Sequence, residues 1–74
     1  MTHNKQQSQL EQDELIYSAQ RAEIEKVLDN DGASTVAHIS KALGLSPYLV
    51  REHCEVMRIQ GDVSHNWVTG RYSR

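Results

Sequence analysis

The sequence has little that could stabilise a small domain by covalent or aromatic means: among 74 residues there are one cysteine, one proline and no phenylalanine. The single thiol, Cys54, excludes an internal disulfide, so the fold depends on packing, and a reducing compartment, the cytoplasm, is expected. The longest apolar runs, 15–17 and 48–50, are three residues each. Such runs are too short for a membrane span or a signal-peptide core, so no membrane partner is expected.

Hydrophobic and aromatic side chains are also few. Hydrophobic residues make up 38% of the chain, and its aromatic residues are Tyr17, Tyr48, Trp67 and Tyr72. A chain of this length forms at most one small domain, with a thin and mainly aliphatic core. A deep, enclosed catalytic pocket is not expected in such a core.

The charge balance lacks the positive excess that is typical of nucleic-acid-binding proteins. Lys and Arg number 8, Asp and Glu number 10, and the net charge is −2. The charges are distributed unevenly, however, with three cations and seven anions in residues 1–37 but five cations and three anions in residues 38–74. The two halves are therefore expected to face different surroundings, the second being the more basic.

The N-terminal part predicts a tail followed by helix. Residues 1–9 are polar and rich in Gln, and they predict a mobile tail because they bury too little apolar surface to offset the entropy of ordering. The stretch 10–28 has no Gly or Pro and consists mainly of helix formers. Its apolar residues fall on two faces, so two interpretations stay open. Either the helix breaks near 17–18 and 10–18 is an N-terminal helical extension, or one continuous helix shows one face to the core and the other to a partner.

Capping signals predict two further helices in the centre of the chain. A Ser or Thr at 34–35 is suited to cap a helix that ends at Gly44. Ser46 followed by Pro47 is typical of the start of the next helix, which Gly61 ends. On this third helix an apolar face is separated from an outward face. The apolar face consists of Val50, His53, Cys54 and Met57, and the outward face of Tyr48, Arg51, Glu52 and Glu55.

Residues 62–74 change character and predict a short β-hairpin. Thr69-Gly70 is one candidate for its turn and the stretch 64–66 is another, and the sequence leaves both open. Because an isolated hairpin is marginally stable, it must pack on the rest of the chain. Trp67 and Tyr72 are the expected packing anchors.

This order of helix, loop, helix, glycine turn, helix and hairpin is typical of a winged helix-turn-helix domain. Residues 24–68 resemble bacterial and phage winged-helix transcription regulators, with a layout similar to small regulators of pilus operons and of prophages. The matching residues are Ile39, Leu43, Gly44, Leu45, Ser46, Val50, His53 and Gly61, and the departures are Ser40, Cys54 and Met57. The resemblance implies a mainly α fold with a small C-terminal β-hairpin, a three-helix core plus wing, over residues 10–74.

The resemblance also implies sequence-specific binding of double-stranded DNA and regulation of transcription. The helix at 47–59 would enter the major groove, and the hairpin at 62–74 would touch the adjacent minor groove or backbone. Arg51 is suited to guanine and Glu52 to cytosine N4, whereas Tyr48 and Ser46 suit phosphate or a thymine methyl group. The remaining expected contacts are Glu55 from the same helix, Lys41 and Arg58 to phosphate, and His65, Asn66, Arg71 and Arg74 from the wing.

Two acidic residues favour an alternative. Glu52 and Glu55 lie on the face that would approach a polyanion, and Arg51 with Glu55 has the i, i+4 spacing of an ordinary solvated pair. A protein-protein interaction module is therefore the competing hypothesis, because winged helices also bind proteins. A phage or plasmid accessory protein that acts on a host factor is a third.

Self-association is a further expectation. If 10–28 is one helix, an apolar stripe is left over after the core face is used, and a homodimer would bury it. The stripe consists of Leu10, Leu15, Ala19 and Ala22.

No residue pattern points to catalysis, a cofactor or a metal. His53 and Cys54 are adjacent but lack the three or four converging ligands that a metal needs, so both are expected to pack in the core. No arrangement of nucleophile and base and no glycine-rich phosphate loop is present. The protein is therefore expected to be non-enzymatic.

Overall fold

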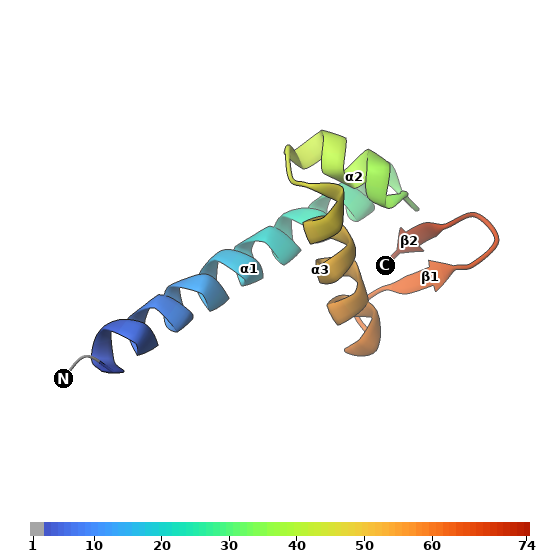
Figure 1. Cartoon of the computed structure of the whole chain (residues 1–74). Helices are drawn as coiled ribbons and strands as arrows, with labels where there is room; N and C mark the ends of the chain where they lie inside the picture. The colour runs from blue at the N-terminus through green and yellow to red at the C-terminus, as the bar shows by residue number, and fades with distance from the viewer. Residues whose placement is uncertain (1–2) are drawn as a thin grey trace.

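The computed structural model describes residues 3–74, with side chains from residue 12 onward. Three helices, α1 (His3–Asp31), α2 (Val36–Leu43) and α3 (Pro47–Ile59), precede the strands β1 (Ser64–Asn66) and β2 (Arg71–Ser73). The two strands pair as an antiparallel hairpin beside α3 (Figure 1). The mainly helical architecture with a small C-terminal hairpin is thus confirmed at this coarse level.

α1 is one continuous helix, so the interpretation with a break near 17–18 is wrong. It packs on the other elements from Tyr17 onward: Ile24 and Leu28 are buried, whereas Leu15 is 71% exposed. Most of its first half extends away from the other elements (Figure 1). Because α1 begins at His3, it also takes in residues 3–9, where the sequence predicts a mobile tail; their mobility stays a prediction.

The predicted capping residues set the bounds of α2 and α3. The Thr35 hydroxyl accepts a hydrogen bond from the backbone N–H three residues on, at 3.2 Å, and starts α2. Gly44 ends α2 with a left-handed φ of 68°, which a residue with a Cβ rarely adopts. Ser46 caps α3 in the same way as Thr35, at 3.1 Å, and Pro47 follows at the first helical position.

A small core lies between the three helices and the hairpin. α2 and α3 contact each other and the second half of α1, and each fully buried aliphatic side chain there contributes about 1.5–3 kcal/mol. The apolar face predicted for α3 is buried as expected. The core residues are Ile24, Leu28, Ile39, Val50, Cys54, Met57, Val63 and Tyr72.

Tyr72 fastens the hairpin to the loop before α2. Its backbone N–H donates to the Ser34 carbonyl at 2.8 Å and its carbonyl accepts from the Ser34 N–H at 2.9 Å. The turn lies between the strands at 67–70, so the Thr69-Gly70 turn is confirmed and the alternative at 64–66 is wrong. The prediction that Trp67 anchors the hairpin is also wrong. Its side chain is 79% exposed, because it lies beyond the last paired residues of the strands.

Candidate nucleic-acid interface

The exposed residues of α3 divide between two hollows on its two sides. The first, here called the hairpin cleft, has a volume of about 490 Å³ and is lined by Thr35, Val36, Ala37, Arg51, Glu55, His65, Trp67, Gly70 and Tyr72. The second, here called the helix groove, has a volume of about 320 Å³ and is lined by Tyr17, Arg21, Tyr48, Leu49, Glu52, His53 and Val56. The outward face predicted for α3 is therefore split: Arg51 and Glu55 face the hairpin cleft, and Tyr48 and Glu52 face the helix groove.

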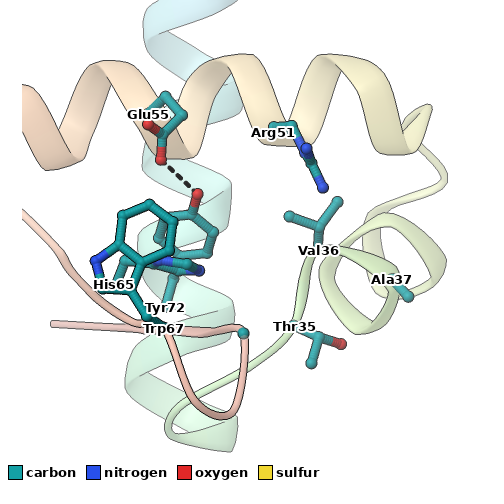
Figure 2. A pocket seen from close by; sticks show the side chains of 9 residues that line it. Thr35, Val36, Ala37, Arg51, Glu55, His65, Trp67 and Tyr72 are labelled. Atoms are coloured by element: carbon teal, nitrogen blue, oxygen red, sulfur yellow. Dashed lines mark hydrogen bonds between the residues drawn. The ribbon is translucent and has the colours of Figure 1, made fainter.

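Figure 2 looks into the hairpin cleft, where Arg51 extends from α3 toward Val36 at the start of α2. Aromatic rings form the opposite wall. The ring centroid of His65 lies 4.4 Å from that of Tyr72 and 4.6 Å from that of Trp67. Nδ1 of His65 is buried and has no hydrogen-bond partner among the described residues. The cleft thus combines one guanidinium group with an aromatic wall.

Glu55 is held by two neighbours. The Tyr72 hydroxyl donates to Oε2 of Glu55 at 2.5 Å, and Arg58 donates to both carboxylate oxygens at 3.0–3.2 Å (Figure 2 shows the bond from Tyr72). The bonds from Arg58, first, and from Tyr72 hold the pKa of Glu55 below its ordinary value. Burial, first, and this carboxylate raise the pKa of Tyr72. Glu55 therefore joins α3 to the hairpin, and its partner on α3 is Arg58 instead of Arg51.

The cations of the C-terminal half separate into paired and free groups. Lys41 on α2, Arg51 on α3 and Arg71 on β2 are exposed, and their side chains make no hydrogen bond or ion pair within residues 12–74. Arg74 instead donates to two carboxylates of α1, at 2.9 and 3.3 Å, and Arg58 is occupied by Glu55. Arg58 and Arg74, which the sequence predicts to contact DNA, are thus bound to carboxylates of the same chain.

The start of α2 adds hydrogen-bond donors beside Arg51. The first N–H groups of an α-helix have no partner inside the helix, and Thr35 caps only one of those of α2. Val36 and Ala37, which carry two others, line the hairpin cleft. Arg71 lines a smaller hollow that also includes Thr35. The N-terminus of α2 therefore has a cation on either side, an arrangement suited to phosphate.

His53 fastens α3 to α1 at the helix groove. Its Nε2 donates to the Gln20 side-chain carbonyl at 2.8 Å, and its Nδ1 accepts from Arg21 at 3.4 Å; these partners assign the tautomer. The Tyr17 ring packs edge-on at 5.6 Å. Burial, first, and the Arg21 charge lower the pKa of His53, so the imidazole is neutral at pH 7. The prediction that His53 packs in the core is confirmed.

The polar residues predicted for the wing mostly have structural roles. Oδ1 of Asn66 accepts from the backbone N–H groups of Val68 and Thr69, at 2.9 and 3.1 Å, and so builds the turn. His65 lies against the rings that flank it, and Arg71 alone among the predicted wing residues presents a free charge. Ser46 accepts a capping bond, yet its hydroxyl hydrogen remains able to donate to phosphate.

Sequence reasoning does not predict two parts of the hairpin cleft as site residues. Trp67 is predicted as a packing anchor, but the strands pair only as far as Asn66 and Arg71, so the turn takes in residues 67–70 and leaves Trp67 outside the strand; the Thr69-Gly70 signal does not show this. The backbone of Val36 and Ala37 is the second part, and the capping residue Thr35 is the signal that indicates a helix N-terminus there.

The stripe predicted for self-association runs along α1 from its projecting first half into the half that packs on the other elements. Leu15, Ala19 and Ala22 are exposed, and the side chain of Leu10 lies outside the described residues. Ile16, next to the stripe, is also exposed. The surface is thus free for a partner, and dimerisation stays a prediction.

The described side chains show little reactive chemistry. Burial raises the pKa of the Cys54 thiol to about 11, so it is protonated at neutral pH and packs as an apolar group. No group of three or more His, Cys, Asp or Glu within the described part of the chain could hold a metal ion.

No helix in residues 3–74 combines the length and apolar character needed to cross a membrane.

Comparison of this chain with known protein families, with curated proteins and with solved structures finds no match in any of the three. Its function is therefore inferred from its own residue pattern and from the geometry around α3.

Proposed function

We propose that the chain is a winged helix-turn-helix protein that binds specific sequences of double-stranded DNA and regulates transcription in the cytoplasm, without catalytic activity, metal or cofactor. The observation that carries the proposal is the placement of the free cations. Lys41, Arg51 and Arg71 come from α2, α3 and the hairpin in turn, and the last two lie on either side of the α2 N-terminus. These are the elements that contact DNA in winged-helix proteins.

Each element has a role in the proposed complex. α3 enters the major groove, where Arg51 donates two hydrogen bonds to a guanine edge. Lys41, Arg71 and the free N–H groups of α2 bind phosphates and fix the register of the protein on the duplex. Tyr48 and Ser46, in the first turn of α3, reach phosphate or a thymine methyl group.

The acidic residues of α3 conflict less with DNA binding than the sequence implies. The Glu55 carboxylate accepts hydrogen bonds from Arg58 and Tyr72. We therefore assign Glu55 to holding the hairpin against α3 and not to base recognition. Glu52, which follows Arg51 in the chain, lines the helix groove and stays exposed, and we assign it to accept from cytosine N4 beside Arg51. One exposed carboxylate, and not two, therefore remains beside the proposed reading face.

A salt titration of duplex binding tests the proposal. Two free cations per chain, Lys41 and Arg71, are assigned to phosphates, so the logarithm of the binding constant should fall with the logarithm of salt concentration with a slope of about −2. Fluorescence anisotropy of a labelled duplex measures this slope, which doubles if two chains bind. Arg51→Ala should lower the affinity for a selected duplex about tenfold or more.

The matched control is Lys26→Ala, which removes the same charge from the exposed face of α1, where Lys26 pairs with Glu23. This variant should bind like the wild type. An absence of duplex binding, or equal losses in Arg51→Ala and Lys26→Ala, would rule out the proposed interface.

Protein binding is the second candidate function, and the helix groove favours it. Tyr48 is 76% exposed at its edge, and Leu15 is exposed further along α1. Such apolar surface suits a second copy of this chain or another protein. A protein partner that survives nuclease digestion and is lost on Tyr17→Ala would support this function over DNA binding.

A further inference from the structure

The tip of the hairpin presents two large apolar side chains to solvent. Trp67 is 79% exposed and Val68 is 95% exposed, although the chain has a single Trp and a thin core that could have used it. Neither residue belongs to the core.

This tip is held in a defined conformation. Asn66 accepts two backbone hydrogen bonds with its side chain, and its carbonyl accepts from the Gly70 N–H at 2.7 Å. The Trp67 ring packs edge-on against His65, which in turn packs on Tyr72. Because Tyr72 is bonded to Glu55 on α3, a continuous series of contacts runs from α3 to the tip. Binding through the tip would therefore need little ordering of the chain.

The tip also lies on the same side of the molecule as the proposed reading residue of α3. Trp67 and Arg51 line the same cleft, and Figure 2 shows both at its edge. The C-terminal stretch 64–74 contains two Arg and no Asp or Glu, and the guanidinium of Arg71, directly after the turn, is free. An apolar tip beside a free guanidinium group is complementary to duplex DNA, in which charged phosphates flank sugar walls and the apolar faces of stacked bases.

We infer that Trp67 and Val68 insert as an apolar wedge into the minor groove next to the major-groove site of α3, an inference that rests on the proposed function. The two side chains contact the sugar walls and partly unstack one base step, as apolar residues of minor-groove proteins do. Arg71 binds the phosphate beside the wedge. The contact adds affinity and a preference for base steps that open easily, without a hydrogen bond to any base.

Intrinsic fluorescence tests the wedge directly, because Trp67 is the single indole of the chain. The probe is a fluorescein-labelled duplex enriched from a random pool, whose anisotropy reports binding independently of Trp67. At saturation the Trp67 emission should be strongly quenched by the bases, and acrylamide should reach the indole much less than in the free protein. Netropsin, a minor-groove ligand, should restore acrylamide access.

The outcomes separate the wedge from the proposed function. If anisotropy shows binding while Trp67 stays as accessible to acrylamide as in the free protein, the wedge is refuted and DNA binding stands. If no duplex binds but a protein partner shields Trp67, both are refuted.

Variants give an independent measure. Trp67→Ala should lower the duplex affinity about tenfold, within the range of aromatic contacts to bases, and Val68→Ser by a smaller factor. Ile59→Ala is the matched control, since Ile59 is 75% exposed at the end of α3 and outside the hairpin. Trp67→Ala should fold normally because its side chain is outside the core. Equal affinities of Trp67→Ala and Ile59→Ala would overturn the inference.

Discussion

Replacing Tyr72 by Phe tests whether its hydroxyl holds the hairpin against α3. The buried ring is retained in Phe, so the variant loses only the hydrogen bond to Glu55 at 2.5 Å. A bond to a charged group contributes about 1.5–3 kcal/mol. Glu55 is partly exposed and keeps Arg58 as a partner, so we expect a smaller loss, about 1–1.5 kcal/mol of unfolding free energy. For a domain of this size the melting temperature should fall by about 5–10 °C.

The pH dependence of this loss follows from the two ionisable groups. The pKa of Glu55 is lowered from 4.5 in the folded chain, so its contribution is present above pH 4.5 and is lost as the pH falls through the lowered value. The pKa of Tyr72 is raised from 10.0, so its contribution is present below pH 10.0 and is lost as the pH rises toward the raised value. The difference between wild type and Tyr72→Phe should therefore be largest between about pH 5 and 9.

Urea denaturation at a series of pH values, followed by circular dichroism, measures the loss of unfolding free energy and its pH dependence. Tyr48→Phe is the control, because Tyr48 is exposed and its hydroxyl makes no hydrogen bond within residues 12–74, so this variant should be as stable as the wild type. The reasoning is refuted if Tyr72→Phe is equally stable at pH 7, or if its deficit does not shrink as the pH falls through the lowered pKa of Glu55.

Three further results are expected. The pKa of His53 is lowered from 6.5, so stability should decline as the pH falls below 6.5, and His53→Gln should flatten that decline in urea titrations. Arg74→Ala should cost less than about 1 kcal/mol, and the deficit should shrink at high salt because the ion pairs with α1 are partly exposed. Leu15→Lys should abolish self-association in sedimentation velocity. A wild-type chain that is monomeric at every concentration would exclude pairing through α1.

The bounds of α2 and α3 could be predicted from the sequence because their causes are local. Thr35 and Ser46 each bond a backbone N–H three residues on, and Gly44 needs only its own left-handed φ. The face of α3 that is buried follows from helical periodicity, which is likewise a property of a short stretch. Such signals need no knowledge of the tertiary arrangement.

The candidate site could be predicted only in part, because its remaining features depend on distant residues. The partner of Glu55 on the hairpin is 17 residues away, and Arg74 reaches Asp29 across 45 residues. The exposure of Trp67 depends on the hairpin register, which pairs His65 with Tyr72 and leaves Trp67 in the turn. Composition alone could not decide which of the two aromatic residues enters the core.

The central claim is that α3 and the hairpin together recognise specific duplex DNA. Selection of bound duplexes from a random pool tests it most directly. We expect enrichment of a short motif, and with Arg51→Ala a loss of preference at one guanine within that motif while its other positions are kept. A pool that shows no enriched motif with the wild-type chain, or an identical motif with Arg51→Ala, would contradict the proposed recognition by α3.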